Sequence, residues 1–234
     1  QALVAPTLLA GAIGNACGLA DDLERAGHTV RPLDLADPGL IAHVDLVLID
    51  VASPAEVRSI AARLAPYARP RQMFLHTALL GGAQLLDDVE TARAIVMCAY
   101  RLHGRTWLTS AADELGEGVV AMLVAESGGT AVPIADSARP RISAAQELRA
   151  AQRTLLIDAH QLLTSAIPNL PALGDEPAGE GPGLDPATAD LLLDAIDDPG
   201  VRRAFVDMQR RGAEQARDAA MQVWAMDKYE GRNQ

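Results

Sequence analysis

Aromatic residues, lysine and cysteine are scarce in this 234-residue sequence. Aromatics make up 3% of the chain although 49% of it is hydrophobic, so its core must consist mainly of Ala, Leu, Val and Ile. That composition suits helices packed on a parallel sheet. The single lysine is Lys228, so any mechanism with a buried catalytic lysine must use that residue. Cys17 and Cys98 share no metal-ligand spacing, and we expect reduced thiols and no metal site.

Positive charge and long apolar runs are also lacking. The formal net charge of −11 argues against nucleic acid and anionic membranes as partners, because both need clustered Lys and Arg. No apolar run reaches the roughly 20 residues that span a bilayer, and the N-terminus lacks the basic region that precedes the apolar stretch of a signal peptide. We therefore expect a cytoplasmic protein that acts on a small molecule.

The first half of the chain alternates short apolar runs with stretches of helical periodicity, as β-α-β units do. The apolar runs predict strands over 2–10, 29–35, 44–51, 72–76, 94–100 and 130–134. The helical periodicity predicts helices over 15–26, 53–67 and 110–127. The predicted fold class is α/β, and residues 1–138 are expected to form a Rossmann-type doubly wound parallel sheet.

The second half has a different pattern, and we expect residues 139–234 to form an all-helical C-terminal domain. Helices are predicted over 143–165, 187–196 and 200–229, with a Pro- and Gly-rich loop over 168–186. A small domain with this much apolar helix often completes its core with a partner subunit. We therefore expect a homodimer formed through the C-terminal helices.

A glycine turn is predicted where the first strand meets the first helix. In dinucleotide-binding proteins, glycines here let the chain bend and let a pyrophosphate approach main-chain N–H groups. The sequence offers Gly11, Ala12, Ile13 and Gly14 for this purpose, although Leu9 stands where the G-x-G-x-x-G pattern has its first glycine.

A carboxylate follows the second predicted strand. Asp34 can accept hydrogen bonds from both ribose hydroxyls of NAD and would repel the 2′-phosphate of NADP. The expected cofactor is NAD or NADP, with NAD preferred. The opposing interpretation is that the fold persists while nucleotide binding has been lost.

Taken in order, four segments resemble the 6-phosphogluconate and β-hydroxyacid dehydrogenase superfamily, in which a Rossmann domain precedes a helical domain. They are GAIGNACGLADDLERAGHTVRPLD (11–34), DLVLIDVASPAEV (45–57), MFLHTALLGGAQLL (73–86) and GGTAVPI (128–134). The resemblance covers roughly residues 2–165. It implies an NAD(P)-dependent oxidoreductase that transfers hydride to or from a small carbonyl, hydroxyl or imine substrate in a cleft between its domains.

The same resemblance implies site residues beyond the glycine turn. It places Ala52 and Ser53 beside the nicotinamide ribose, and His76 and Thr77 near the substrate pocket. Several branches of the superfamily use a lysine on the first helix of the second domain as proton donor. This chain has none over 143–165, so lysine-based chemistry is not expected.

Two histidines remain as candidate proton donors. His76 ends an apolar strand at the edge of the sheet where doubly wound folds bind ligands. His103 follows the next strand and could face the same pocket. A histidine bonded to the backbone and a histidine in a solvated loop are the structural alternatives.

The second functional hypothesis is a catalytically inactive Rossmann-like binding or scaffold protein. One form of it is a degenerate relative of the short-chain dehydrogenases, since TLLAGAIG (7–14) resembles the T-G-x-x-x-G-x-G turn of that family. The family's Y-x-x-x-K motif is absent, because Tyr100 is followed four residues later by Gly104.

Overall fold

The computed structural model describes residues 7–167 and 183–230. The chain divides into two compact units, Gln1–Arg139 and Pro140–Gln234. Each unit has its own secondary structure and packing. Among the described residues, no helix combines the length and apolar character needed to cross a membrane.

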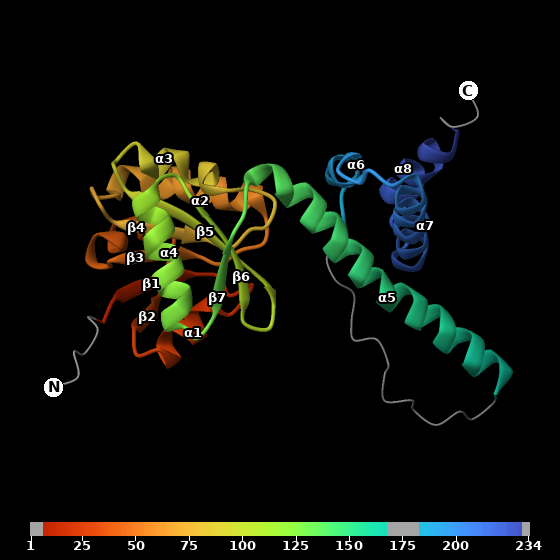
Figure 1. Ribbon diagram of the computed structural model, residues 1–234, viewed down its shortest axis with the longest axis horizontal. Coiled ribbons are helices and arrows are strands. Elements are labelled where there is room, and N and C mark those ends of the chain that lie inside the picture. Colours follow the sequence, from red (N-terminus) through yellow and green to blue (C-terminus); the bar gives the residue numbers. More distant parts are fainter. Residues whose placement is uncertain (1–6, 168–182, 231–234) are drawn as a thin grey trace. The chain divides into compact units, whose positions relative to one another are not determined.

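Unit 1 is built on one sheet of seven strands in the order β2-β1-β3-β4-β5-β6-β7 (Figure 1). Neighbouring strands are parallel except β5 and β6, which are antiparallel. The strands are β1 (Leu9–Ile13), β2 (Thr29–Pro32), β3 (Leu46–Ile49), β4 (Met73–His76), β5 (Ile95–His103), β6 (Thr106–Ala111) and β7 (Thr130–Pro133). The predicted fold class is confirmed, with a sheet that is mostly rather than wholly parallel.

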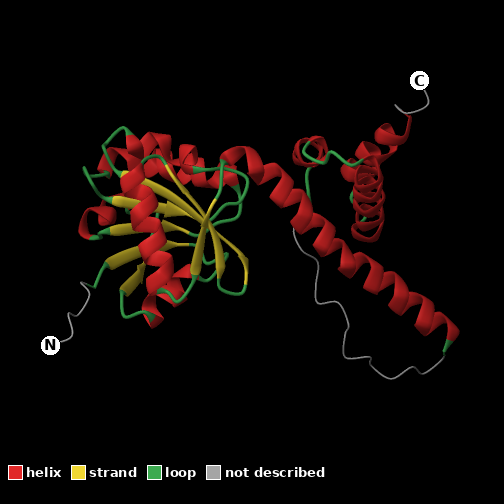
Figure 2. Ribbon diagram, viewed as in Figure 1, coloured by secondary structure: helices red, strands yellow, loops and turns green. Residues whose placement is uncertain are grey.

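Helices cover both faces of this sheet (Figure 2). They are α1 (Leu19–Arg25), α2 (Pro54–Leu64), α3 (Asp87–Glu90) and α4 (Glu114–Glu126), with 3-10 turns at Pro38–His43, Ala65–Tyr67, Ala83–Leu86 and Asp136–Ala138. Alternate strand residues point to opposite faces. Leu48 packs with α1 and α4, whereas Ile49 packs with α2 and α3. Two apolar cores therefore enclose a central sheet.

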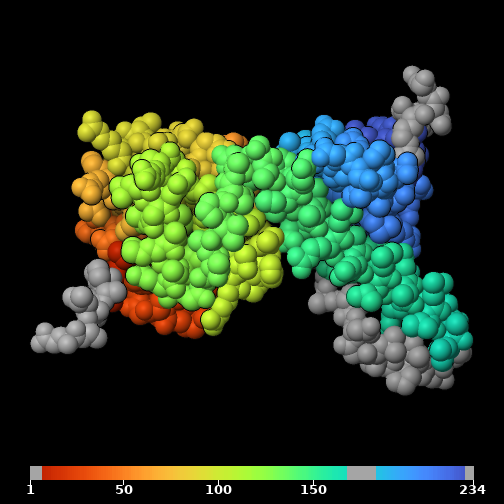
Figure 3. Space-filling model, viewed as in Figure 1, coloured from red at the N-terminus to blue at the C-terminus, as the bar shows by residue number. Residues whose placement is uncertain are grey.

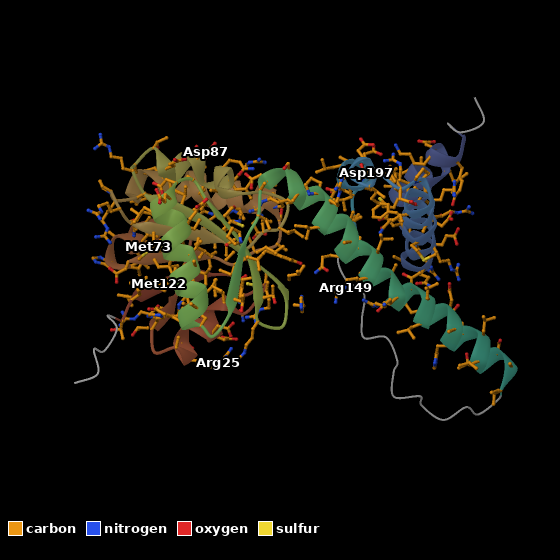
Figure 4. All side chains as sticks on the ribbon, viewed as in Figure 1. Arg25, Met73, Asp87, Met122, Arg149 and Asp197 are labelled. Atoms are coloured by element: carbon orange, nitrogen blue, oxygen red, sulfur yellow. The ribbon has the colours of Figure 1, made fainter. Side chains whose placement is uncertain are left out.

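The outer side of α4 faces solvent. Figure 3 shows this helix on the surface of unit 1, and Met122, labelled in Figure 4, is 51% exposed there. The inner side carries Val120, Leu123 and Val124, which are buried against the sheet. The spacing of these residues is that of one helical face, so α4 is a covering layer of the core.

The first strand lies later in the chain than predicted. We expected it over 2–10, of which 1–6 fall outside the described residues, but β1 spans Leu9–Ile13. Gly11 pairs with Arg31 of β2 and Val47 of β3. The apolar run continues to Ile13, so the sequence does not mark where the strand ends. Pairing with β2 on one side and with β3 on the other fixes β1 at Leu9–Ile13. The turn is consequently Gly14–Gly18, and the first helix starts at Leu19.

The strand β6 was missed by the sequence analysis. Residues 110–127 were predicted to form one helix, but Ser110 and Ala111 belong to β6 and the helix begins at Glu114. Asp113 caps that helix, because its side chain accepts a hydrogen bond from the Gly116 N–H. The strand pairs with β5 in a hairpin, which makes the sheet mixed.

Unit 2 contains the helices α5 (Arg139–Ala166, whose first residue closes unit 1), α6 (Pro186–Asp194), α7 (Pro199–Ala216) and α8 (Ala219–Glu230). Most of the loop predicted over 168–186 lies outside the described residues. The single helix predicted over 200–229 is wrong. Arg217 adopts a left-handed conformation (φ 58°), which ends α7, and Asp218 caps α8 by accepting from the Met221 N–H. The break lets Trp224 pack edge-on against Phe205 with ring centres 6.5 Å apart.

Candidate functional site

The carboxyl ends of three central strands lie in register at one edge of the sheet in unit 1. Ile13 of β1 pairs with Ile49 of β3, which pairs with His76 of β4. After β1 the chain leads to β2 on one side, while β3 lies on the other side of β1. In doubly wound sheets ligands bind outside the carboxyl ends of strands at such a reversal. The residues that follow these strand ends therefore form the candidate site.

The turn after β1 runs from Gly14 to Gly18, and both glycines need their conformations. They have φ values of 79° and 73°, which side chains rarely adopt. A Cβ atom on Gly14 would also clash with the main-chain oxygen of Asp50. The turn consequently lies directly against the end of β3.

Asp50 is the central residue of this edge, and only 1% of its surface is exposed. Its Oδ1 accepts hydrogen bonds from the Cys17 N–H (3.0 Å) and from the Thr77 hydroxyl (2.7 Å). Its main-chain oxygen accepts from the Ala16 N–H (3.0 Å). The buried Oδ2 has no hydrogen-bond partner among the described residues. Two amides of the glycine turn thus point inward to one aspartate.

The turn is held from its other side by Arg101 of β5. Its Nε donates to the Cys17 carbonyl (3.0 Å), its Nη2 pairs with the Asp22 carboxylate, and its guanidinium lies 4.3 Å from the Trp107 ring centre. Burial, together with the neighbouring Asp50 carboxylate, raises the pKa of the Cys17 thiol to about 12. Cys17 is therefore a neutral thiol in a turn whose main chain is bonded on both sides.

Gly11, predicted to lie in the turn, is instead inside β1. A Cβ atom at this position would clash with the Leu33 side chain. Its lack of a side chain makes room for Leu33, which packs on the core of the α2 face. Ala12 and Ile13 likewise belong to β1. Of the four glycine-turn residues predicted from the sequence, Gly14 alone lies in the turn.

Three other predicted cofactor residues lie at exposed positions after strand ends. Ala52 and Ser53 follow β3, and the Ser53 hydroxyl caps α2 by accepting from the Glu56 N–H (3.3 Å). Asp34 follows β2, and its Oδ1 accepts from the Ala36 N–H (2.8 Å). Thr77 differs from these, because it is 3% exposed and its hydroxyl donates to Asp50.

His76 is a buried histidine with both ring nitrogens bonded. Its Nδ1 accepts from the Ala78 N–H (3.2 Å), so its Nε2 carries the proton and donates to the Gly82 carbonyl (2.9 Å). Burial lowers the pKa of His76 to about 4. No surface of the side chain is exposed. In this structure His76 is neutral and fixes the loop that follows β4, and neither nitrogen is free for a substrate.

The structure does not bring the two candidate histidines together. His76 pairs with Cys98 of β5, and His103 lies five residues further along that strand, roughly 16 Å away at the usual rise per residue. His103 is exposed next to the turn between β5 and β6. The two histidines cannot serve one compact pocket.

A buried arginine closes the same edge beside β5. Arg139 is 2% exposed, and its guanidinium donates to Asp136 (2.7 Å), to the Leu79 carbonyl (3.1 Å) and to the Ser110 hydroxyl (2.6 Å). These bonds use its donors within unit 1, so Arg139 fastens the loop after β4 to β6. Among the described residues, no group of three or more His, Cys, Asp or Glu side chains could hold a metal ion.

Comparison with known proteins agrees with this architecture. Residues 135–228 match the family model described as 6-phosphogluconate dehydrogenase C-terminal domain-like. The predicted superfamily resemblance is confirmed. A comparison with curated protein sequences finds no match.

Solved structures with the same fold include dehydrogenases and reductases of this superfamily. The 3-hydroxyisobutyrate dehydrogenase of Mycobacterium tuberculosis is 17% identical with a TM-score of 0.57, and the match covers 95% of this chain and 99% of that one. The prephenate dehydrogenase of A. aeolicus, determined with NAD+, is 13% identical (TM-score 0.51, 99% and 89% covered). The pyrroline carboxylate reductase of Plasmodium falciparum, determined with NADP, is 12% identical (TM-score 0.51, 94% and 96% covered).

The fold of this superfamily implies a dinucleotide whose diphosphate lies on the turn after β1. In the conformation described here that turn does not fit a diphosphate. The amides of Ala16 and Cys17 are already bonded to Asp50, and the buried Asp50 carboxylate places a negative charge directly beneath them. Asp50 was not among the residues singled out from the sequence.

Proposed function

We propose that the protein is an NAD(P)-dependent oxidoreductase that acts on a small carbonyl, hydroxyl or imine compound. The observation that carries this proposal is the likeness along both units to 3-hydroxyisobutyrate dehydrogenase, which covers 99% of that chain. The match of residues 135–228 to the dehydrogenase C-terminal domain model supports it. The reversal of strand order beside β1 supplies the place where such folds bind a dinucleotide.

Three exposed residues would contact the cofactor in this proposal. Asp34 lies after β2, where a carboxylate can accept the ribose hydroxyls and favour NAD over NADP. Ala52 and Ser53 lie after β3, within the same edge. His103 would be the proton donor, because this histidine is exposed whereas His76 is fully buried.

Calorimetric titration with NADH and with NADPH tests the proposal directly. We expect saturable binding of at least one of them, and tighter binding of NADH. The Asp34→Ser variant should lose that preference, because the charge that repels the 2′-phosphate is gone. Asp37→Ser, which removes a charge from a nearby exposed position, is the matched control. Absence of binding of either cofactor at millimolar concentration would refute the proposed function.

A second candidate function is a binding or scaffold protein without turnover. The bonded turn amides and the enclosed His76 favour it, because a catalytic site needs accessible donors. If neither NADH nor NADPH binds in the same titration, only the second candidate is left. If NADH binds, its turnover with a panel of small keto acids and imines separates a catalyst from a binding protein.

We further propose that the protein forms a homodimer through its C-terminal helices. Exposed leucines of α5 recur seven residues apart and lie on one side of the helix, at 155, 156, 162 and 163. Leu162, the most exposed of them at 71%, would lie at the interface. Sedimentation analysis should show a dimer that Leu162→Glu weakens and Gln161→Glu leaves unchanged. A monomeric wild-type chain would refute this proposal.

A further inference from the structure

The amides of the glycine turn are directed at a group of the protein itself. The Ala16 N–H is bonded to the main-chain oxygen of Asp50, and the Cys17 N–H is bonded to its carboxylate. A diphosphate on this turn would need such N–H groups as donors. Asp50 therefore supplies the negative charge and the acceptor atoms that a bound diphosphate would otherwise supply.

The carboxylate also carries an unused acceptor. Oδ2 of Asp50 is buried and unbonded among the described residues, while Oδ1 has two donors. Leaving a buried carboxylate oxygen without a donor is costly, so an aspartate needs a reason to occupy this position. Packing of the apolar core does not require a carboxylate here, and Asp50 lies just after the end of β3. Asp50 does not cap a helix either, because the cap of α2 is Ser53.

We propose that Asp50 is an internal competitor of the cofactor diphosphate, and that it sets how tightly this chain binds a dinucleotide. The inference rests on the proposed function. Two like charges a few ångströms apart repel strongly where solvent is excluded. A dinucleotide can use the turn only when Asp50 gives up its bonds to the amides of Ala16 and Cys17, so the aspartate weakens binding.

The contacts of Arg101 add to this effect. Its bond to the Cys17 carbonyl holds the peptide group that follows the Cys17 amide, and its pairing with Asp22 anchors that contact on α1. Rotation of the Cys17 amide toward a ligand would disturb these contacts. The turn is thus held in the conformation that favours Asp50.

Titration of NADH into the full chain and two Asp50 variants tests the proposal. Asp50→Asn removes the charge and keeps the shape, whereas Asp50→Ala removes both the charge and the acceptors. We expect each variant to bind NADH at least tenfold more tightly than the wild type. The Asn variant keeps the test valid if the Ala variant does not fold, which circular dichroism will show.

Asp45→Asn is the matched control. Asp45 flanks the other end of β3, and its Oδ2 also accepts a main-chain N–H, that of Leu9 (3.0 Å). The control removes the same charge at a site away from the turn, and its affinity should equal that of the wild type. Equal NADH affinities for the wild type and both Asp50 variants would overturn the inference and leave the proposed function intact. If no variant binds NADH or NADPH, the proposed function fails and the inference fails with it.

The reactivity of Cys17 gives a second readout at the turn, and the buried Cys98 serves as the internal control for global unfolding. Alkylation of folded protein by iodoacetamide at pH 8 should be slow in the wild type and at least several-fold faster in Asp50→Asn, because the carboxylate beside the thiol is gone. Cys98 is fully buried and should not react. Saturating NADH should then protect Cys17 in the variant. Labelling at the wild-type rate, with no protection, would contradict a role of Asp50 at the turn.

Discussion

The two ends of β3 carry the same residue in different surroundings. Asp45 at the amino end is exposed, and Asp50 at the carboxyl end is 1% exposed, although each accepts a main-chain N–H from the β1 side. Water can solvate the free oxygen of Asp45. At Asp50 only the protein can do so, and one oxygen has no partner among the described residues. The comparison shows that burial, rather than residue type, makes an aspartate consequential for the site.

The difference between exposed and buried groups should be largest when a buried group at the carboxyl ends of the strands is forced to change its charge. The pKa of His76 is lowered to about 4 in the folded protein, from an ordinary value of 6.5. Between these values the unfolded chain binds the proton more tightly, so stability falls as the pH falls from 6.5 to 4. The loss amounts to roughly 3 kcal/mol for a shift of this size.

Urea unfolding at pH 7 and at pH 4.5 measures this loss. His76→Gln should be less stable than the wild type at pH 7 and should show a smaller fall between the two pH values. His103→Gln, which changes an exposed histidine, is the control and should follow the wild type. An unchanged pH dependence in His76→Gln would show that the buried imidazole is not the group responsible.

The next largest effect on stability is expected at Thr77, whose hydroxyl donates a hydrogen bond to Asp50. Thr77→Val keeps the shape of the side chain and removes the hydroxyl that donates to Oδ1 over 2.7 Å. A hydrogen bond to a buried charge contributes about 2 kcal/mol, so the free energy of unfolding should fall by about that amount.

Thr91→Val provides the comparison for that experiment. Thr91 donates over the same distance to the Asp88 carbonyl, a neutral acceptor at an exposed position. Its loss should cost well under half as much. Equal losses in the two variants would mean that the carboxylate at 50 does not depend on Thr77.

A smaller effect on stability is expected at Ser53, which is exposed and lies three residues after Asp50. Ser53→Ala removes the cap of α2 and should lower the free energy of unfolding by about 1 kcal/mol. If Ser53 also contacts the cofactor, the same variant should weaken NADH binding. Asp198→Ala, which removes the cap of α7 in unit 2, should cost similar stability without changing NADH binding.

The smallest effect belongs to the amino end of β3. Asp45→Asn should change the free energy of unfolding by at most about 0.5 kcal/mol, since its surroundings are exposed and its amide oxygen can still accept from Leu9. A loss as large as that of Thr77→Val would remove the distinction between the two ends.

Periodicity predicted the layers of unit 1 because each element follows the spacing of its apolar residues. The run over 44–51 predicted β3, which spans Leu46–Ile49 and is shorter than the run at both ends, and Ser53-Pro54 correctly predicted the start of α2. The start of β1 could not be predicted in the same way, because the apolar run continues through Ile13 and only pairing with β2 and β3 selects the residues that join the sheet. β6 was missed since its short run borders a helical pattern.

The sequence alone determined the α/β class, the helical second half and the superfamily resemblance, since these depend on spacings within the chain. Tertiary structure alone decided the state of the site. The Asp50 carboxylate lies 33 residues along the chain from the Cys17 amide and 27 residues from the Thr77 hydroxyl, and the three groups meet where parallel strands end together. One sequence signal was present, an acid directly after four apolar residues of β3. Its meaning depended on burial and on partners that follow two other strands, which spacing within a segment does not encode.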